Sequence, residues 1–335
     1  MRTPRFLLSV LLAVCSSSAL ADTAIRFALD WRFEGPAAPY FVALDKGYYK
    51  AEGLDVTIDP GASSVEPINR VATATYQMGF ADINSLIKYR DNPQNPPVKA
   101  VMMVYDTPAF SIVTLKDKGI TKPKDLEGKV LGAPAPDGAY AQWPIFVDAN
   151  GIDASKVRIE NIGFPVREPM LAQGRVDAIT GFWFSSFMNL KANGVKEEDI
   201  VVLLLRDYGV DLYGNAILAN PEFMKNNPEA VRGFVRATIK GIQDTIKDPD
   251  SAIDSLMKRN AIANRDVELQ RLKLSLERNF VTDDVKKNGL GNVDPQRLEK
   301  SIEQIGLTFN YTNKPKASDV FTADFLPPAA ERQIN

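Results

Sequence analysis

The fold is decided by residues 25–58, IRFALDWRFEGPAAPYFVALDKGYYKAEGLDVTI, in which two strand-like patterns flank a helix-like one. Apolar and polar residues alternate over 25–29, which predicts a short buried strand. Glycine and proline then interrupt the pattern in a loop that contains Trp31. An apolar stripe follows and predicts a helix that Gly47 ends, and a second alternating run from Leu54 predicts the next strand. Together these patterns predict a βαβ unit.

The loop after the first predicted strand is a candidate binding loop. In an open parallel sheet, ligands bind at the carboxyl ends of the strands. We therefore expect Trp31, Arg32 and Glu34 to face a ligand cleft. Pro39 is compatible with the first turn of the following helix, because its missing N–H group costs no hydrogen bond there.

The first residues are typical of a signal peptide. Arg2 and Arg5 precede an apolar run over 6–14, and Ala-Leu-Ala at 19–21 resembles a cleavage site. The apolar run is too short to cross a bilayer, which takes roughly 20 residues as a helix. We therefore predict that residues 1–21 form a cleaved signal peptide and that the protein is secreted.

Cys15 offers an alternative interpretation of this segment, as the lipidated cysteine of a lipoprotein signal. Such a signal normally carries a small residue directly before the cysteine, whereas this chain has Val14, so ordinary cleavage is favoured. Cleavage would remove the only cysteine of the chain. The mature protein would then form no disulfide and would offer no thiol nucleophile.

The chain contains no histidine. Histidine is the usual general base near neutral pH and the commonest metal ligand. Its absence excludes Ser-His-Asp and Cys-His catalytic sites and imidazole-bound zinc. We predict a protein that is not an enzyme, with no catalytic residues, no metal and no cofactor. After signal cleavage 38 basic and 42 acidic side chains remain, which argues against nucleic acid or an anionic membrane as partner.

Two similar phrases indicate two similarly built lobes. A predicted helix over 65–74 leads to residues 76–85, YQMGFADINS, and another over 168–171 leads to 172–181, AQGRVDAITG; after each helix come a glycine, an aspartate and a short apolar strand. Coincidence in a common connection is the alternative. The 314 residues left after cleavage exceed the ~250 to 300 at which single cores stop growing, which also favours two lobes.

The chain is expected to cross twice between these lobes. Strand-like runs are interrupted near Asp106 and again near Tyr208. The interruptions predict lobe 1 over 22–105 and 212–335, and lobe 2 over 106–211.

Eight segments, in order, resemble periplasmic substrate-binding proteins of the NMT1/THI5-like family, relatives of the nitrate, taurine and aminopyrimidine binders of ABC importers. They are LDW at 29–31, KGYYKAEGLDV at 46–56, TLKDKGI at 114–120, KPKDLEGKVLGAP at 122–134, NGID at 150–153, GRVDAITG at 174–181, DYGV at 207–210 and NPEAVRGFVRATIKG at 227–241. The resemblance spans most of the mature chain. It implies the α/β, two-lobed periplasmic binding protein type II fold.

The resemblance also implies a function. The protein is expected to be a monomeric periplasmic receptor that hands a small-molecule ligand to an ABC permease and ATPase in the inner membrane. The fungal pyrimidine synthases that share this fold are thought to use a histidine and a cysteine-rich segment, and this chain has neither. A histidine-free enzyme on the same scaffold and a sensory binding module remain the alternatives.

Aromatic side chains are concentrated at predicted loops and strand ends. Such side chains can hold a planar ligand by burial and stacking, and core packing is the alternative role. The candidates are Trp31, Tyr140, Phe182, Trp183 and Tyr213. Asn84 directly follows a predicted strand of lobe 1 and is a further candidate.

Charged residues narrow the expected ligand. Sulfonate-binding relatives present hydroxyl side chains at the turn over 133–140, where this chain has Asp137, which would repel an anion and would instead cap the helix or bind an amine. Aminopyrimidine binders carry a glutamate in the aromatic run that corresponds to 181–187, and this run has none. Glu34 or Asp137 would have to replace it. We expect a planar nitrogen heterocycle similar to a thiamin precursor; a sulfonate, or an aromatic acid held by Arg32 or Arg167, is the alternative.

Overall fold

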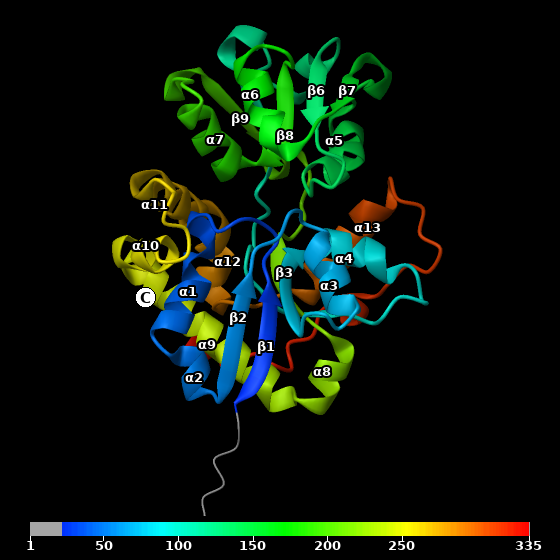
Figure 1. Cartoon of the computed structure of the whole chain (residues 1–335). Coiled ribbons are helices and arrows are strands. Elements are labelled where there is room, and N and C mark those ends of the chain that lie inside the picture. The colour runs from blue at the N-terminus through cyan, green and yellow to red at the C-terminus, as the bar shows by residue number, and fades with distance from the viewer. Residues whose placement is uncertain (1–21, 335) are drawn as a thin grey trace, which may run out of the picture.

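The computed structural model describes residues 22–334. The predicted signal peptide, with Cys15, lies outside the described residues. Two five-stranded sheets organise the described part into two lobes, each with helices against its sheet (Figure 1). No helix in residues 22–334 combines the length and the apolar character needed to cross a membrane. The predicted two-lobed α/β fold is confirmed.

The sheet of the first lobe combines four strands from before the first crossing with one strand from after the second. In spatial order it contains β2 (Leu54–Asp59), β1 (Thr23–Ala28), β3 (Met78–Asp82), β10 (Asn215–Ala219) and β4 (Lys99–Met103). Strand β1 is parallel to β2 and β3, whereas β10 is antiparallel to β3 and β4.

The sheet of the second lobe repeats this arrangement. Its spatial order is β7 (Arg158–Asn161), β6 (Val130–Ala133), β8 (Ala178–Phe182), β5 (Phe110–Leu115) and β9 (Ile200–Leu204). Strand β6 is parallel to β7 and β8, and β5 is antiparallel to β8 and β9. In each sheet the fourth strand is thus the one that the chain forms directly after a crossing.

The two similar sequence phrases occupy equivalent places. Helix α3 (Glu66–Ala72) leads into β3, and α6 (Arg167–Ala172) leads into β8, each the third strand of its sheet. A helix follows each strand without a loop, α4 (Ile83–Arg90) after β3 and α7 (Trp183–Ala192) after β8. The equivalence predicted from the sequence is confirmed. The exact lobe boundaries, 105/106 and 211/212, stay a prediction.

The crossings run over 104–109 and 205–214, the second with the 3₁₀ turn η8 (Leu205–Tyr208), and they pair with each other. The N–H of Gly214 donates to the carbonyl of Tyr105 at 2.9 Å. Position 214 has no room for a side chain, since a Cβ there would lie 2.8 Å from the carbonyl oxygen of Tyr105.

The opening stretch folds as the sequence predicts. After β1 come a 3₁₀ turn, η1 (Gly35–Ala37), and α1 (Ala38–Asp45) with Pro39 in its first turn. Gly47, with φ of 70°, separates α1 from α2 (Tyr48–Ala51) before β2 begins. Because the loop over 29–37 directly follows β1, it lies at the carboxyl edge of the first sheet.

Helices from the C-terminal part complete the first lobe. Asp294 caps α13 (Pro295–Gly306) by accepting from two backbone N–H groups, whereas Asn227, which precedes α9 (Pro228–Lys247), makes no side-chain cap bond. The C-terminal helices are α8 (Pro221–Asn226), α9 (Pro228–Lys247), α10 (Pro249–Met257), α11 (Arg265–Ser275), α12 (Asp283–Asn288), α13 (Pro295–Gly306) and α14 (Ala317–Val320). One further helix, α5 (Trp143–Asn150), belongs to the second lobe.

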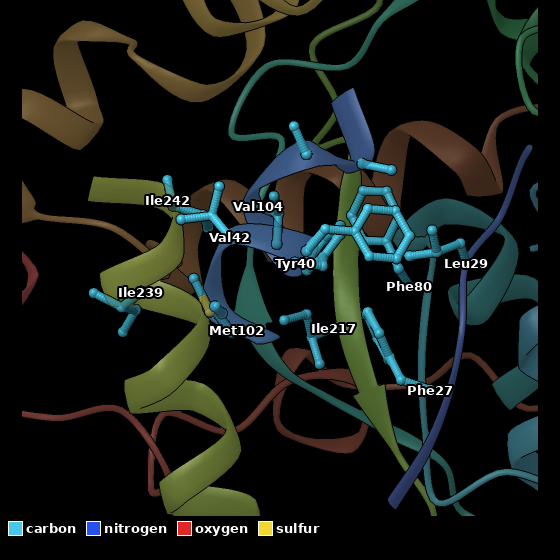
Figure 2. Packing of buried hydrophobic residues seen from close by; sticks show 14 of the residues in the cluster. Phe27, Leu29, Tyr40, Val42, Phe80, Met102, Val104, Ile217, Ile239 and Ile242 are labelled. Carbon is cyan, nitrogen blue, oxygen red and sulfur yellow. The ribbon is translucent and has the colours of Figure 1, made fainter. Parts of the chain in front are cut away.

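The core of the first lobe lies between its sheet and helices α1 and α9. The apolar side chains of α9 face this core, and Figure 2 shows Ile239 and Ile242 of α9 near Val42 of α1. The ring of Tyr40 packs against Phe27 and Phe80 at centroid distances of 5.1 and 5.7 Å. These rings fill the core between β1, β3 and α1.

Candidate functional site

A cleft lies at the carboxyl ends of the strands and is lined from both lobes. Its empty volume is about 630 Å³, part of it open to solvent, within the ~300 to 1,000 Å³ common for small-molecule pockets. The strand ends contribute Trp31 after β1, Ser63 and Ser64 after β2, Tyr105 after β4, Asp137 after β6, Phe164 after β7 and Phe182 at the end of β8. This placement follows the general rule for ligand sites on open α/β sheets.

Aromatic rings form much of the cleft wall. Trp31 of the first lobe meets Phe164 of the second edge to face, with ring centroids 4.8 Å apart. Tyr105 packs against Phe80 at 5.2 Å, and both line the cleft. A planar apolar ligand would gain burial against these rings, with stacking adding about 0.5 to 1.5 kcal/mol per aromatic pair.

Asp30 is the most buried carboxylate of the first-lobe wall. Its Oδ2 accepts a hydrogen bond from Asn215 Nδ2 at 2.7 Å, and 9 % of the residue is exposed. Burial raises the pKa of Asp30 to about 7, its own N–H and Asn215 oppose the rise, and the nearby Glu34 and Asp82 add to it. The Asp30 carboxyl therefore changes charge near neutral pH.

Tyr40 presents a buried hydroxyl to the same wall. Its side chain is 1 % exposed, it lines the cleft, and its hydroxyl has no hydrogen-bond partner among the described residues. Buried hydroxyl groups in proteins are nearly always hydrogen-bonded. The missing partner of the Tyr40 hydroxyl points to a ligand as its partner, because Tyr40 lines the cleft.

Asp137 is the corresponding carboxylate of the second lobe. Thr180 Oγ1 donates to its Oδ2 at 2.6 Å, and the N–H of Ala139 donates to its Oδ1 at 3.2 Å. Burial raises the pKa of Asp137, and the charge of Arg167 and the bond from Thr180 oppose the rise. Asp137 accepts from the backbone of the turn that follows β6, but it does not cap the helix over 143–150, whose N-cap is Gln142 with no side-chain cap. Its side chain lines the cleft.

Arg167 is the buried cation of the cleft, and it is already paired. Its Nε and Nη2 donate to Glu168 Oε1 at 2.9 and 2.7 Å, and Ser186 Oγ donates to the same oxygen at 2.9 Å. Both charged side chains are nearly inaccessible to solvent. The pair is therefore locally neutral, and an anionic ligand would have to share Arg167 with Glu168.

Glu34 connects the two lobes across the cleft. Its Oε1 accepts from Trp31 Nε1 at 3.1 Å, and its Oε2 accepts from Ser185 Oγ of the second lobe at 2.9 Å. Arg271 Nε lies 3.5 Å from the same Oε2. Glu34 thus orients Trp31 and is a point of contact that depends on how close the lobes lie.

Five of the nine expected site residues line the cleft: Trp31, Arg32, Glu34, Asp137 and Phe182. Arg32 is exposed and lies over the Trp31 ring, with its guanidinium carbon 5.2 Å from the centroid. No group of three or more potential ligands among residues 22–334 is placed to hold a metal ion.

Trp183 and Tyr140 are expected site residues that the structure places elsewhere. The sequence suggested that Trp183 lies in a loop, but it begins α7 and points to the C-terminal helices, where Asn279 Oδ1 accepts from its indole N–H at 3.1 Å. Tyr140 opens the 3₁₀ turn η4 (Tyr140–Gln142) and packs against the hydrophobic cluster beside it. Neither lines the cleft.

Asn84 and Tyr213 do not line the cleft either. Their side chains make hydrogen bonds to backbone groups instead. Asn84 Nδ2 donates to Asp82 Oδ1 and to the carbonyl of Tyr213, both at 2.7 Å. The Tyr213 hydroxyl accepts from the N–H of Asp294, and Arg297 lies 3.9 Å over its ring. Fully buried, these residues brace the second crossing against α4 and α13.

Several lining residues were not predicted. Tyr105, Phe164 and Ser64 follow strand ends, so the rule that selected Trp31 would have found them. Tyr40 gave no such signal, because it sits within an apolar helical stripe that is typical of a core.

Comparison with known proteins gives related sequences over most of the chain. Residues 36–252 match the family model described as NMT1/THI5 like. The riboflavin-binding protein RibY of Chloroflexus aurantiacus is 30% identical, with 87% of this chain and 82% of that protein covered. The formylaminopyrimidine-binding protein of Halalkalibacterium halodurans is 28% identical, with 81% and 84% covered. A 4-amino-5-hydroxymethyl-2-methylpyrimidine phosphate synthase of Aspergillus parasiticus is 26% identical, with 92% of each covered.

Solved structures with low sequence identity share the fold. The alkanesulfonate-binding protein SsuA from Xanthomonas axonopodis pv. citri, bound to MOPS, has a TM-score of 0.68 at 13% identity, with 91% of this chain and 100% of that chain covered. The periplasmic aliphatic sulphonate binding protein SsuA from Escherichia coli has a TM-score of 0.67 at 12% identity, with 93% and 92% covered.

Proposed function

This chain belongs to the NMT1/THI5-like family, and from that premise we propose that it is the periplasmic solute-binding component of an ABC importer. Its ligand is a small planar nitrogen heterocycle, held in the cleft between the lobes. The observation that carries the proposal is the cleft itself, whose aromatic walls from both lobes surround buried carboxylates. Two related proteins are named for binding riboflavin and formylaminopyrimidine, both planar nitrogen heterocycles.

The aromatic wall supports a planar ligand over a small anion. Trp31 and Phe164 come from opposite lobes, and Phe182 and Phe184 extend the apolar surface. A nitrate or taurine molecule would leave most of this surface uncovered. A ring system would bury it, and burial of apolar area contributes about 25 cal/mol per Å².

The charges of the cleft also disfavour sulfonates and aromatic acids. Asp30, Glu34 and Asp137 line it, and Arg167 is paired with Glu168. An anion buried beside these carboxylates would pay a large desolvation cost, and the other cation of the lining, Arg32, is exposed over the Trp31 ring. The nitrogen-bound hydrogens of a heterocycle can instead donate to these carboxylates.

A binding role is favoured over catalysis. The synthase relative shows that the family includes enzymes. This chain has no histidine, and its single cysteine, Cys15, lies within the predicted signal peptide. Secretion through that signal peptide, capture in the periplasm and delivery to an inner-membrane permease and ATPase complete the proposed role.

Two measurements test the proposal. Native mass spectrometry of freshly purified mature protein should reveal a co-purified small molecule, or none if the site empties during purification. Calorimetry with riboflavin, formylaminopyrimidine, taurine and nitrate should then give saturable binding of at least one heterocycle with no turnover of it. Tighter binding of taurine or nitrate than of either heterocycle, or conversion of the bound heterocycle to a product, would contradict the proposal.

A further inference from the structure

One wall of the cleft contains a polar group that the protein leaves without a partner. The Tyr40 hydroxyl is buried and has no hydrogen-bond partner among the described residues. Asn215, which does not line the cleft but bonds to Asp30 behind it, also has an unpartnered Oδ1. Tyr105 lines the cleft beside Tyr40. Burial raises the pKa of both tyrosines, and the nearby Asp30 adds to the rise. Both phenols therefore keep their protons and can donate to a ligand.

Asp30 shares this wall and has no cation to stabilise its charge. No lysine or arginine within residues 22–334 forms an ion pair with it. Two acidic groups act on its charge, Glu34 in the loop after β1 and Asp82 at the end of β3. Burial, the largest cause of its raised pKa, and the repulsion from these two acids both favour the protonated form of Asp30.

A carboxylic acid offers a different hydrogen-bonding pattern from a carboxylate. The acid has one O–H donor beside one carbonyl acceptor, whereas the carboxylate only accepts. An acid therefore matches a ligand edge on which a donor and an acceptor lie side by side. A carboxylate matches an edge of two donors, such as a protonated aminoheterocycle.

The Tyr40 hydroxyl distinguishes between two uncharged ligand edges, one in which the acceptor is a ring nitrogen and one in which it is a carbonyl oxygen. A ring nitrogen has one lone pair, which Asp30 alone would use, whereas a carbonyl oxygen has two and can also accept from a second hydroxyl. Resting on the proposed function, we propose that Asp30 and Tyr40 form a specificity subsite that holds a cyclic amide, a ring edge with an N–H beside a carbonyl. Asp30 binds this edge uncharged, accepting from the ligand N–H and donating to its carbonyl, and Tyr40 donates to the same carbonyl.

The test is calorimetry on the mature protein with four probes. Riboflavin carries the cyclic amide edge, riboflavin methylated on the ring N–H of that edge lacks the donor, formylaminopyrimidine offers an amine beside a ring nitrogen, and taurine is an anion control. We expect riboflavin to bind at least tenfold more tightly than its methylated form. We also expect its affinity to fall by about thirtyfold from pH 6 to pH 8.5, as the acid form of a group with pKa about 7 becomes scarce.

Two variants test which side chains cause the pH dependence and the affinity for riboflavin. Asp30→Asn keeps a donor and an acceptor without a charge, so riboflavin should still bind and its pH dependence should disappear. If the dependence persists, it comes from another group of the cleft, such as Asp137, and the assignment is wrong. Tyr40→Phe should weaken riboflavin binding by about three- to tenfold, as for the loss of one hydrogen bond.

Tyr49→Phe is the matched control for Tyr40→Phe. Tyr49 is equally buried, but its hydroxyl bonds to Thr238 outside the cleft. Its replacement should leave riboflavin affinity unchanged, while the far-ultraviolet circular dichroism of all variants should match that of the original protein. An equal loss in both variants would assign the Tyr40 effect to general packing and overturn its role.

The outcomes separate this inference from the proposed function. Tight binding of formylaminopyrimidine with no binding of riboflavin, or binding that strengthens above pH 7, would overturn the cyclic-amide subsite and leave the heterocycle receptor standing. Equal binding of riboflavin and its methylated form would do the same. Binding of taurine alone, or of none of the probes, would overturn both.

Discussion

The indole N–H of Trp183 donates to Asn279 Oδ1 at 3.1 Å, and both side chains are buried. Trp183 begins α7 in the second lobe, whereas Asn279 lies in a π-helical turn, η9 (Leu276–Phe280), far along the chain. Asn279 Nδ2 also donates to the carbonyl of Thr107 in the first crossing at 2.9 Å. One amide therefore ties the second lobe to a crossing and to the C-terminal helices, next to the cleft.

Asn279→Ala is expected to weaken ligand binding by about three- to tenfold, although Asn279 does not line the cleft. Its loss leaves a buried donor and a buried acceptor unpaired, at a cost of about 1 to 3 kcal/mol for each group. If the lobes close on the ligand, this cost falls on the closed state, and small-angle scattering should show less compaction at saturating ligand. Asn193→Ala, which removes only a bond to the carbonyl of Asn189, is the control.

The pair can be tested as a unit with Trp183→Phe. This change removes the indole N–H and keeps an aromatic ring, so alone it should weaken binding less than Asn279→Ala, which also removes the bond to Thr107. Because the two side chains share one hydrogen bond, the double variant should lose less affinity than the sum of the single losses. Strict additivity would mean that the bond does not contribute to binding.

Trp31→Ala is expected to weaken binding of the true ligand at least tenfold, about 1.4 kcal/mol. The change removes the ring that meets Phe164 across the cleft and the donor to Glu34. Trp31→Phe should recover part of the affinity. Trp143→Phe, in a buried position away from the cleft, should leave affinity unchanged. Calorimetry showing equal affinity for Trp31→Ala and the original protein would remove Trp31 from the site.

Asp30→Asn is expected to stabilise the ligand-free protein in a pH-dependent way. Burial raises the pKa of Asp30 from 3.8 to about 7. Between these values the folded protein binds more protons than the unfolded chain, so the contribution of Asp30 to stability is fully present below about pH 4 and is lost as pH rises through 7. Asparagine carries no charge, and its amide has an acceptor nearby in the unpartnered Asn215 Oδ1.

Denaturant unfolding at several pH values measures this effect. The two proteins should differ little near pH 4, and the variant should be more stable by a few kcal/mol at pH 8, since one unit of pKa shift corresponds to about 1.4 kcal/mol. A constant difference across this range would show that Asp30 is charged in the folded protein at all these pH values.

The fold was largely predictable because its signals are local. Gly47, Pro39 and the alternation over 25–29 act on their neighbours in the chain, and the structure has the elements that they predict. The repeated phrases predicted two equivalent units for the same reason. The antiparallel place of β10 between β3 and β4 depends on contacts between distant segments, and no local pattern shows it.

Site residues could be predicted from the sequence only where a place directly after a strand end is enough to bring the side chain to the cleft. Trp31 and Trp183 both follow strand ends, but α7 begins at once after β8 and turns Trp183 toward Asn279, a residue nearly a hundred positions away. Tyr40 shows the opposite case. Its neighbours in sequence are apolar, and only the three-dimensional arrangement shows that Tyr40 lines the cleft and that its buried hydroxyl has no partner among the described residues.

Gly214→Ala tests the contact between the two crossings. A Cβ at position 214 would lie 2.7 Å from the Cβ of Tyr105 and 2.8 Å from its carbonyl oxygen, so one crossing must move away from the other. Overpacking of this kind typically costs about 1 to 3 kcal/mol, and a displaced Tyr105 would also disturb the cleft wall. We expect a lower melting temperature together with weaker ligand binding. Gly163→Ala is the control, because a Cβ there meets only Pro165, at 3.6 Å. Equal melting temperatures and affinities for the two variants would show that the crossings tolerate the separation.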